Sequence, residues 1–336
     1  MAVQNFNLSW CRYVICGILL GSCMGCCKTG KKKNDATTAL KTSYIHQYGV
    51  EVADQDDWIA RGGTGEIVKV QKNGVVLREN YIHGILNGIS SWTFPGRDTI
   101  EKNRRYHNGV LVEEISNYPT GMSKQKIVYK KDNTVDVTSW YEDGIPRAEE
   151  ELRGSKLLSG RYFSQSHEIE SEVKAANGIR IVRNGLGELQ SKDTIVHGEL
   201  LLQECYHSNG TPESRTPYMN GKAHGVRLTF FPGGEPQAIE QWEKGQLHGK
   251  MQIFENGVRI AEIPYQYGKK HGVEYRFQNG SDTVIEEITW ASDERHGPSV
   301  SIAGTIQATD WYYAGQKVSK STYLERGLVS QFTRDR

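Results

Sequence analysis

Four copies of one eight-residue pattern run through residues 198–297: YMNGKAHG at 218–225, WEKGQLHG at 242–249, YQYGKKHG at 265–272 and the looser WASDERHG at 290–297. Each copy begins with an aromatic residue and ends in His-Gly, and an earlier His-Gly stands at 197–198. The five histidines lie 27, 24, 23 and 25 residues apart. Self-similarity at a nearly fixed period of this size is typical of proteins built from stacked structural repeats.

One unit of the repeat predicts two strands joined by a turn. Residues 226–231 alternate as a strand does, with Val226, Leu228 and Phe230 on one face, and Pro-Gly-Gly follows at 232–234. The next two units place Asn-Gly between alternating strands, which is the strongest short-range signal for a β-hairpin. A lone hairpin is marginal in water, so each unit depends on its neighbours. The sequence therefore predicts an all-β fold, an elongated antiparallel array of about eight to ten β-hairpins in a solenoid or meander.

Glycines and aromatic residues recur at fixed places in the units. Because glycine adopts a positive φ without steric cost, we predict that the repeated glycines form tight turns. These repeat-turn positions are Gly84, Gly109, Gly221, Gly225, Gly245, Gly249, Gly268, Gly272 and Gly297. We predict that the aromatic residues form the stacking core, and a partly exposed ladder for a protein or glycan is the alternative. The aromatic positions are Tyr81, Trp92, Tyr218, Trp242, Tyr265, Trp290 and Trp311.

The pattern aromatic-x-x-Gly-x-x-His-Gly, with an Asn-Gly turn midway, resembles the MORN repeat, and in particular the bacterial MORN-variant repeats of the YwqK-like antitoxin family. The resemblance is good over residues 198–297 and degenerate elsewhere. It implies a repeat scaffold, and it specifies the architecture much better than the function. The family label implies, as an alternative function, an antitoxin-like protein that neutralises a partner toxin.

The repeat pattern weakens toward the N-terminus. Gly84 and Gly109 keep the 25-residue spacing, whereas residues 110–197 follow it only in part, and 149–152 and 168–176 are equally compatible with short helices. We expect one continuous array with insertions, and a carbohydrate-binding or enzymatic domain hidden in 110–197 is an alternative. The predicted division is an adapter at 41–64, degenerate repeats at 65–197, regular repeats at 198–317 and a C-terminal cap at 318–336.

The first 22 residues resemble a secretion signal. Residues 14–20 form an apolar run that is too short for a membrane-spanning helix, which needs about 20 residues. Residues 20–23 (LGSC) resemble a bacterial lipobox. This implies that Cys23 is lipid-modified and anchors the chain in the cell envelope, with the outer membrane favoured, while residues 23–40 form a basic polar tether. The alternatives are a signal anchor, a plain signal peptide, or a eukaryotic protein palmitoylated at Cys26 and Cys27.

Composition and motifs argue against several kinds of site. Lysine and arginine number 41 against 40 acidic residues, whereas a nucleic-acid binder should be distinctly basic. Histidines of successive hairpins should lie about 9.5 Å apart, too far to share a metal ion, so we interpret them as turn residues. No P-loop or nucleophile elbow is present, and acids such as Glu286 and Glu287 are assigned to solvated strand faces.

The function expected from these observations is non-enzymatic. We expect no catalytic residue, no cofactor and no nucleic-acid partner. The chain should be a membrane-anchored lipoprotein, attached to lipid through Cys23, that presents its β-repeat surface to an unknown protein partner.

Overall fold

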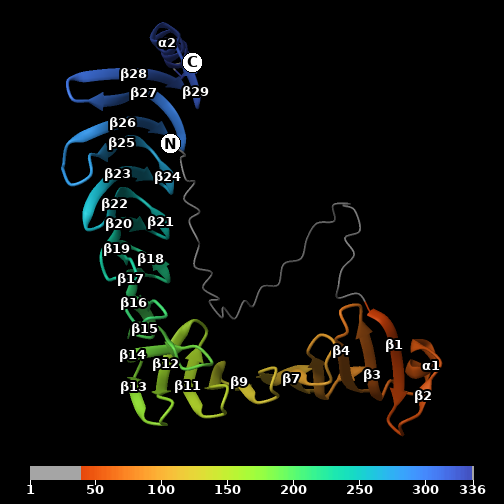
Figure 1. Cartoon of the computed structure of the whole chain (residues 1–336). Coiled ribbons are helices and arrows are strands. Elements are labelled where there is room, and N and C mark those ends of the chain that lie inside the picture. The colour runs from red at the N-terminus through yellow and green to blue at the C-terminus, as the bar shows by residue number, and fades with distance from the viewer. Residues whose placement is uncertain (1–38, 335–336) are drawn as a thin grey trace.

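The described residues of the chain fold into one open antiparallel sheet of 29 strands with a helix at each end (Figure 1). A computed structural model describes residues 39–334, so the predicted signal segment and Cys23 lie outside the described residues. Each long strand pairs with the next in chain order, and the sheet bends into an L. The all-β hairpin array predicted from the repeats is confirmed.

The first arm of the L contains the following elements: β1 (Ala39–His46), β2 (Glu51–Val52), α1 (Gln55–Ala60), β3 (Gly65–Gln71), β4 (Val76–Ile82), β5 (Ile85–Leu86), β6 (Gly88–Thr93), β7 (Ile100–His107), β8 (Val110–Asn117) and β9 (Ser123–Tyr129). The corner follows with β10 (Thr134–Trp140), β11 (Pro146–Arg153), β12 (Lys156–Phe163), β13 (Ile169–Lys174) and β14 (Asn177–Arg183). Both segments that were also compatible with short helices are therefore strands, β11 and β13, because they continue the ladder between their neighbours.

The second arm contains the regular repeats and the C-terminal helix. Its elements are β15 (Leu189–Val196), β16 (Glu199–Tyr206), β17 (Pro212–Met219), β18 (Lys222–Ala223), β19 (Gly225–Phe230), β20 (Pro236–Glu243), β21 (Gln246–Leu247), β22 (Gly249–Glu255), β23 (Val258–Gln266), β24 (Lys269–Lys270), β25 (Gly272–Phe277), β26 (Val284–Ala291), β27 (Glu294–Ala303), β28 (Ile306–Tyr313), β29 (Gln316–Val318) and α2 (Lys320–Arg334).

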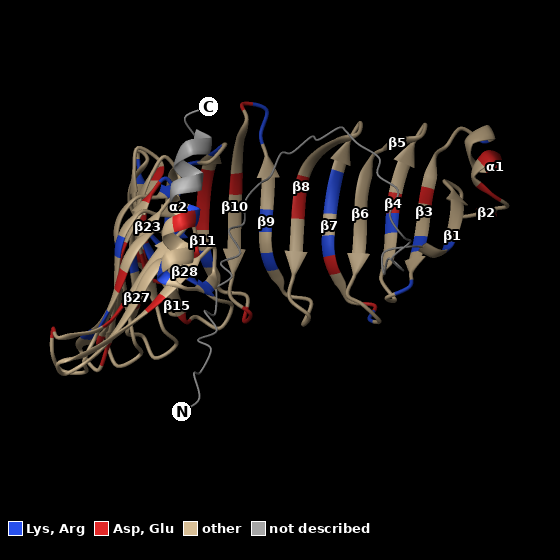
Figure 2. Ribbon diagram, turned by 90° about the horizontal axis from the view of Figure 1, so that it is seen from above, with Lys and Arg blue, Asp and Glu red and all other residues tan. Residues whose placement is uncertain are grey.

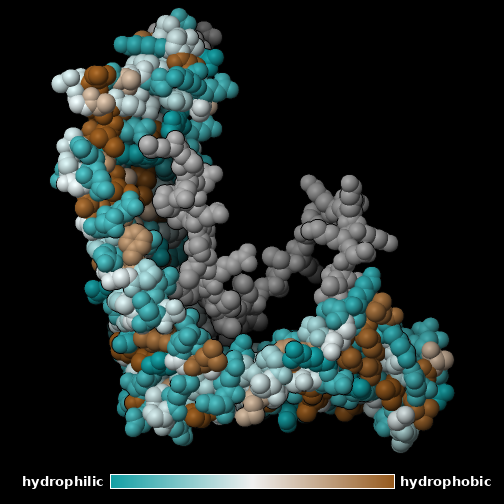
Figure 3. Space-filling view, in the orientation of Figure 1, coloured by the Kyte–Doolittle hydropathy of each residue, from teal (hydrophilic) through white to brown (hydrophobic). Residues whose placement is uncertain are grey.

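The sheet is a single layer over most of its length, because the two helices cover only its ends (Figure 1). Hydrophobic residues consequently reach the surface among polar ones along both arms (Figure 3). Charged side chains are paired across neighbouring strands, as the blue and red bands on β7 to β9 show (Figure 2). Arg104 binds Glu114 at 2.5 Å and Lys126 binds Glu113 at 2.8 Å. Within residues 39–334, no helix has the length and apolar character needed to cross a bilayer.

One edge of the sheet is a stack of two-residue turns. In each turn two consecutive residues have positive φ, as in Asn220 (52°) and Gly221 (72°), which is the geometry of a type I′ hairpin turn. The second turn residue donates its N–H to a carbonyl of the preceding unit: Gly109 to Leu86, Gly245 to Ala223 and Gly268 to Leu247, each at 2.8 Å. The structure thus places Gly84, Gly109, Gly221, Gly245 and Gly268 in turns. Gly225, Gly249 and Gly272 instead begin strands β19, β22 and β25, and Gly297 lies within β27.

Helix α1 caps the first edge. Trp58 of α1 is buried against Val52 and Ile67 and contacts the rings of Tyr44 and Tyr81. The Asp54 side chain accepts a hydrogen bond from the N–H of Asp57 at 2.9 Å and begins the helix. The segment predicted as an adapter is therefore part of the sheet and its cap.

The last copy of the motif lacks the His-Gly glycine. Counting from the turn glycine Gly315, Val318 and Ser319 occupy the places that His271 and Gly272 hold after Gly268. Gly272 opens a strand with a φ of +108°, a value that L-residues other than glycine rarely adopt. Ser319 instead accepts a hydrogen bond from the N–H of Thr322 at 3.1 Å, so it caps α2 and the chain leaves the sheet.

Tyr323→Ala is expected to detach α2 from the sheet. The Tyr323 ring lies 5.1 Å from Trp311, 5.6 Å from His296 and 6.3 Å from Tyr313, and a helix of 15 residues is marginal without tertiary contacts. Hydrogen exchange should show loss of amide protection in α2 and unchanged protection in β26. Leu324→Ala, at an exposed position of the same helix, is the matched control and should leave protection intact.

Candidate functional site

The motif aromatics and the His-Gly glycines form cross-strand pairs. Gly225 lies opposite Trp242, Gly249 opposite Tyr265 and Gly272 opposite Trp290, and the same pairing joins Gly65 with Tyr81 in the first arm. A Cβ on Gly272 would also approach Cγ of Pro264 to 3.2 Å. Each unit therefore places a large ring next to a position without a side chain, on the same face of the sheet throughout.

Two predicted aromatic positions lie elsewhere. The residue opposite Gly297 is Tyr312, and Trp311 points to the other face, where it pairs with Pro298 and contacts Tyr323 of α2. Trp311 stands four residues before its turn glycine, whereas the aromatic residue of the motif stands three residues before it. Because side chains alternate along a strand, this shift by one residue puts Trp311 on the opposite face of the sheet. Trp92 lies within β6 opposite Lys102, and Tyr106 takes the motif place opposite Gly88.

The rings and nearby cations hold a series of carboxylates on this face. Trp242 donates its indole N–H to Glu240 at 2.7 Å, and Arg227 binds the same carboxylate at 3.1 Å. Trp290 donates to Glu274 at 2.9 Å, while Lys270 and Arg276 bind Glu274 at 3.0 and 3.1 Å. We call these groups the aromatic–carboxylate clusters.

The first arm has a similar cluster. Lys69 binds Glu79 at 2.8 Å, and Tyr81 donates its hydroxyl to Glu79 at 3.3 Å. Burial, with the negative charge of Glu79, raises the pKa of Tyr81 to about 12, so this hydroxyl stays protonated and acts as a donor. Sequence reasoning missed these clusters, although Glu-x-aromatic at 79–81 and 240–242 was a usable signal, because residues two apart on a strand share a face.

A larger cluster lies at the corner of the L. Tyr162 is almost fully buried among Leu157, Val173 and Ile195, and it donates its hydroxyl to Glu150 at 2.9 Å. Arg180 binds the same carboxylate at 2.8 Å. Burial raises the pKa of the Tyr162 hydroxyl and the pKa of the Asp193 carboxyl group. The positive charge of Arg180 and a hydrogen bond from Ser191 offset part of the rise at Asp193. These groups are satisfied by one another, as buried polar groups in a stable core are.

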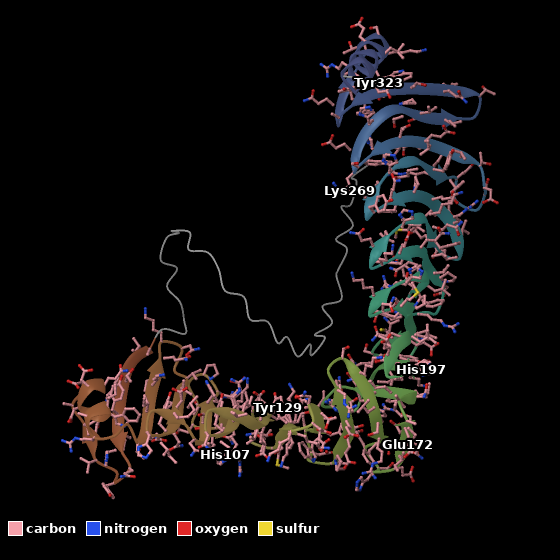
Figure 4. All side chains as sticks on the ribbon, turned by 180° about the vertical axis from the view of Figure 1, so that it is seen from behind. His107, Tyr129, Glu172, His197, Lys269 and Tyr323 are labelled. Carbon is pink, nitrogen blue, oxygen red and sulfur yellow. The ribbon has the colours of Figure 1, made fainter. Side chains whose placement is uncertain are left out.

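The opposite face of the corner carries an open depression of about 510 Å³. Strand β13, with Glu172 (Figure 4), forms one side of it. Each of its exposed-face carboxylates is bound by a cation: Lys130 binds Asp136 at 2.6 Å and Glu151 at 3.4 Å, Arg161 binds Glu149 at 2.5 Å, and Lys174 binds Glu172 at 2.6 Å. This is the concave place that a hidden enzymatic or carbohydrate-binding domain in 110–197 would use, and its acids are arranged as ion pairs.

The repeated histidines lie at the stacked turns. Nδ1 of His248 accepts a hydrogen bond from the Tyr267 N–H at 3.4 Å, and Nδ1 of His296 accepts one from the Ala314 N–H at 3.3 Å. Both rings also contact a tyrosine of the next turn. Across residues 39–334, the structure holds no group of three or more His, Cys, Asp or Glu side chains placed to bind a metal ion.

Comparison with known proteins identifies no relative for the whole chain. No family profile and no curated protein sequence matches it. Among solved structures, it is similar to the crystal structure of TcdB2-TccC3, with 13% identity, a TM-score of 0.16, and coverage of 74% of this chain and 16% of that one. The corresponding values for TcdB2-TccC3 without its hypervariable C-terminal region are 12%, 0.17, 82% and 17%. The chain spans about a sixth of the length of those structures. TM-scores this low support no conclusion about shape or function.

Proposed function

We propose that the chain is a non-enzymatic envelope lipoprotein, built from MORN-variant repeats, that presents its sheet to a protein partner. The observation that carries the proposal is the architecture of the described part: a long single-layer sheet in which many charged groups form ion pairs with one another. The aromatic–carboxylate clusters and the ion pairs of the corner stiffen this surface without leaving a convergent set of reactive groups. A rigid, extended repeat surface suits recognition of another macromolecule.

The membrane attachment rests on the LGSC sequence that ends at Cys23. Labelling of growing cells with a palmitate analogue tests it. We expect the wild-type chain to incorporate the label and Cys23→Ala to lose at least about nine-tenths of it, because the thiol is the acceptor of the lipid. Cys26→Ala is the matched control and should keep the label. Equal labelling of all three chains would remove the anchor from the proposal.

The resemblance to the YwqK-like antitoxin family gives a second candidate function, which can be tested in the same cells. An antitoxin-like protein would keep its folded part in the cytosol. Protease added to intact spheroplasts should digest residues 39–334 if the chain faces the outside of the inner membrane and should spare them if the chain is cytosolic. Protection from protease in spheroplasts, with digestion after lysis, would favour the antitoxin function over the lipoprotein.

A further inference from the structure

The last long strand of the sheet, β28, has an unused pairing edge. In four earlier units, the residues four and three positions before the motif aromatic pair with the strand that follows: Leu77 and Arg78, Ser214 and Arg215, Ala238 and Ile239, and Ala261 and Glu262. Since Tyr312 takes the aromatic place in β28, the equivalent residues are Ala308 and Thr309. In the described part of the chain β28 pairs with β27 and, through residues 311–313 only, with β29.

The backbone groups on this edge can be assigned from the register. Tyr313 and Gln316 flank a two-residue turn, so they form a hydrogen-bonded pair, and hydrogen bonding then alternates along the strand. The N–H and C=O groups of Thr309 and Gln307 therefore point away from β27. In an earlier unit the residue equivalent to Thr309 is Glu262, and on this side it pairs with Tyr275 of the following strand. All five residues from Ile306 to Asp310 are exposed, so α2 does not cover them.

We propose that β28 binds an extended segment of a partner protein, which adds to the sheet as an antiparallel strand beside residues 306–310. The ligand chemistry is that of the missing repeat strand: a polypeptide with free backbone N–H and C=O groups over about five residues. The last copy of the motif carries Val318 and Ser319 in place of His-Gly, and the described part of the chain leaves this place uncovered, whereas natural proteins normally protect such edges. The assignment specifies the protein-binding role proposed above and rests on it.

A second copy of β28 does not fit the same place. In a two-fold antiparallel pair that joins Gln307 of one copy to Thr309 of the other, residue 311 lies opposite residue 305. Strand β29, which pairs with residues 311–313, would then collide with the hairpin turn after Ala303 in the partner copy. The free edge therefore suits a single extended segment without such a flanking strand.

The test uses the chain's own repeat strand as the probe. A dye-labelled peptide with the sequence of residues 271–278 (HGVEYRFQ), which contains β25, is titrated with the full chain and followed by fluorescence anisotropy. We expect saturable binding that Thr309→Pro weakens by at least about tenfold, because proline removes the outward N–H and its ring obstructs the edge. Thr309→Ala keeps the N–H and should bind within about twofold of wild type.

The possible results separate the proposals. Thr309→Pro removes no hydrogen bond to β27, so its circular dichroism should match wild type, and loss of binding is then due to the edge. Equal binding by Thr309→Pro, or no saturable binding of the peptide by the wild-type chain, would overturn the assignment of this edge. A wild-type dimer in light scattering that Thr309→Pro converts to a monomer would also overturn it, because a second copy would then be the occupant. These outcomes do not depend on whether Cys23 incorporates the palmitate label.

Discussion

Gly178→Ala is expected to destabilise the corner of the sheet by about 3 kcal/mol or more, measured by urea denaturation. Gly178 has a φ of +148°, and a Cβ there would lie 2.2 Å from the carbonyl oxygen of Glu172. That obstacle is backbone, so no side-chain rotation relieves it. Strands β13 and β14 are joined by two residue pairs only, and Val173, the partner of Gly178, belongs to the buried core around Tyr162. Moving the backbone apart would therefore open the core as well.

Gly154→Ala is the matched control for this experiment. Gly154 also has a positive φ, +59°, and lies in the neighbouring turn between β11 and β12, but a Cβ there meets nothing within 4 Å. The substitution should cost only the conformational penalty of a left-handed residue, about 1 kcal/mol. If the two variants lost equal stability, the close approach of Glu172 to Gly178 would be irrelevant to the fold.

The periodicity of the sequence was sufficient to predict the class of fold. Glycine at fixed intervals and Asn-Gly between alternating segments both indicated stacked hairpins, and β17 to β27 are arranged so. The same reasoning placed the end of the regular repeats at residue 317, and the last strand, β29, spans Gln316–Val318. The reason it worked is that tight turns need particular residues locally, so the sequence records them directly.

Burial on the two faces of the strands could not be predicted in the same way. Val226, Leu228 and Phe230 suggested the apolar face, yet Val226 is half exposed and the opposite face of β19 carries the buried Thr229. Glu286 was assigned to a solvated face, whereas it binds Arg276 at 3.1 Å on the face of Ile288. A single-layer sheet buries side chains by its curvature and by neighbouring strands, and neither is visible in the alternation of one strand.

Glu274→Gln is expected to destabilise the second arm, with a loss of about 3 kcal/mol in the free energy of unfolding. The carboxylate is 2% exposed and receives Lys270, Arg276 and the indole of Trp290. Glutamine keeps the shape but leaves the ammonium group of Lys270 without its carboxylate partner in a partly buried place, while Arg276 keeps its ion pair with Glu286. Urea denaturation measures the loss, and the exposed Glu255→Gln serves as the control, expected within about 0.5 kcal/mol of wild type.

The damage in Glu274→Gln should come from the unpaired Lys270 cation and not from loss of the acid itself. Glu274 lies directly opposite Ile288, which is fully buried, so the surroundings accept an apolar side chain. Glu274→Met combined with Lys270→Met removes the carboxylate together with its more buried cation, while Arg276 keeps its ion pair with Glu286. We expect this double variant to recover at least about half of the lost stability, since replacing a buried ion pair by apolar residues is often neutral. A double variant less stable than Glu274→Gln would mean that the carboxylate itself, through Trp290, holds β25 and β26 together.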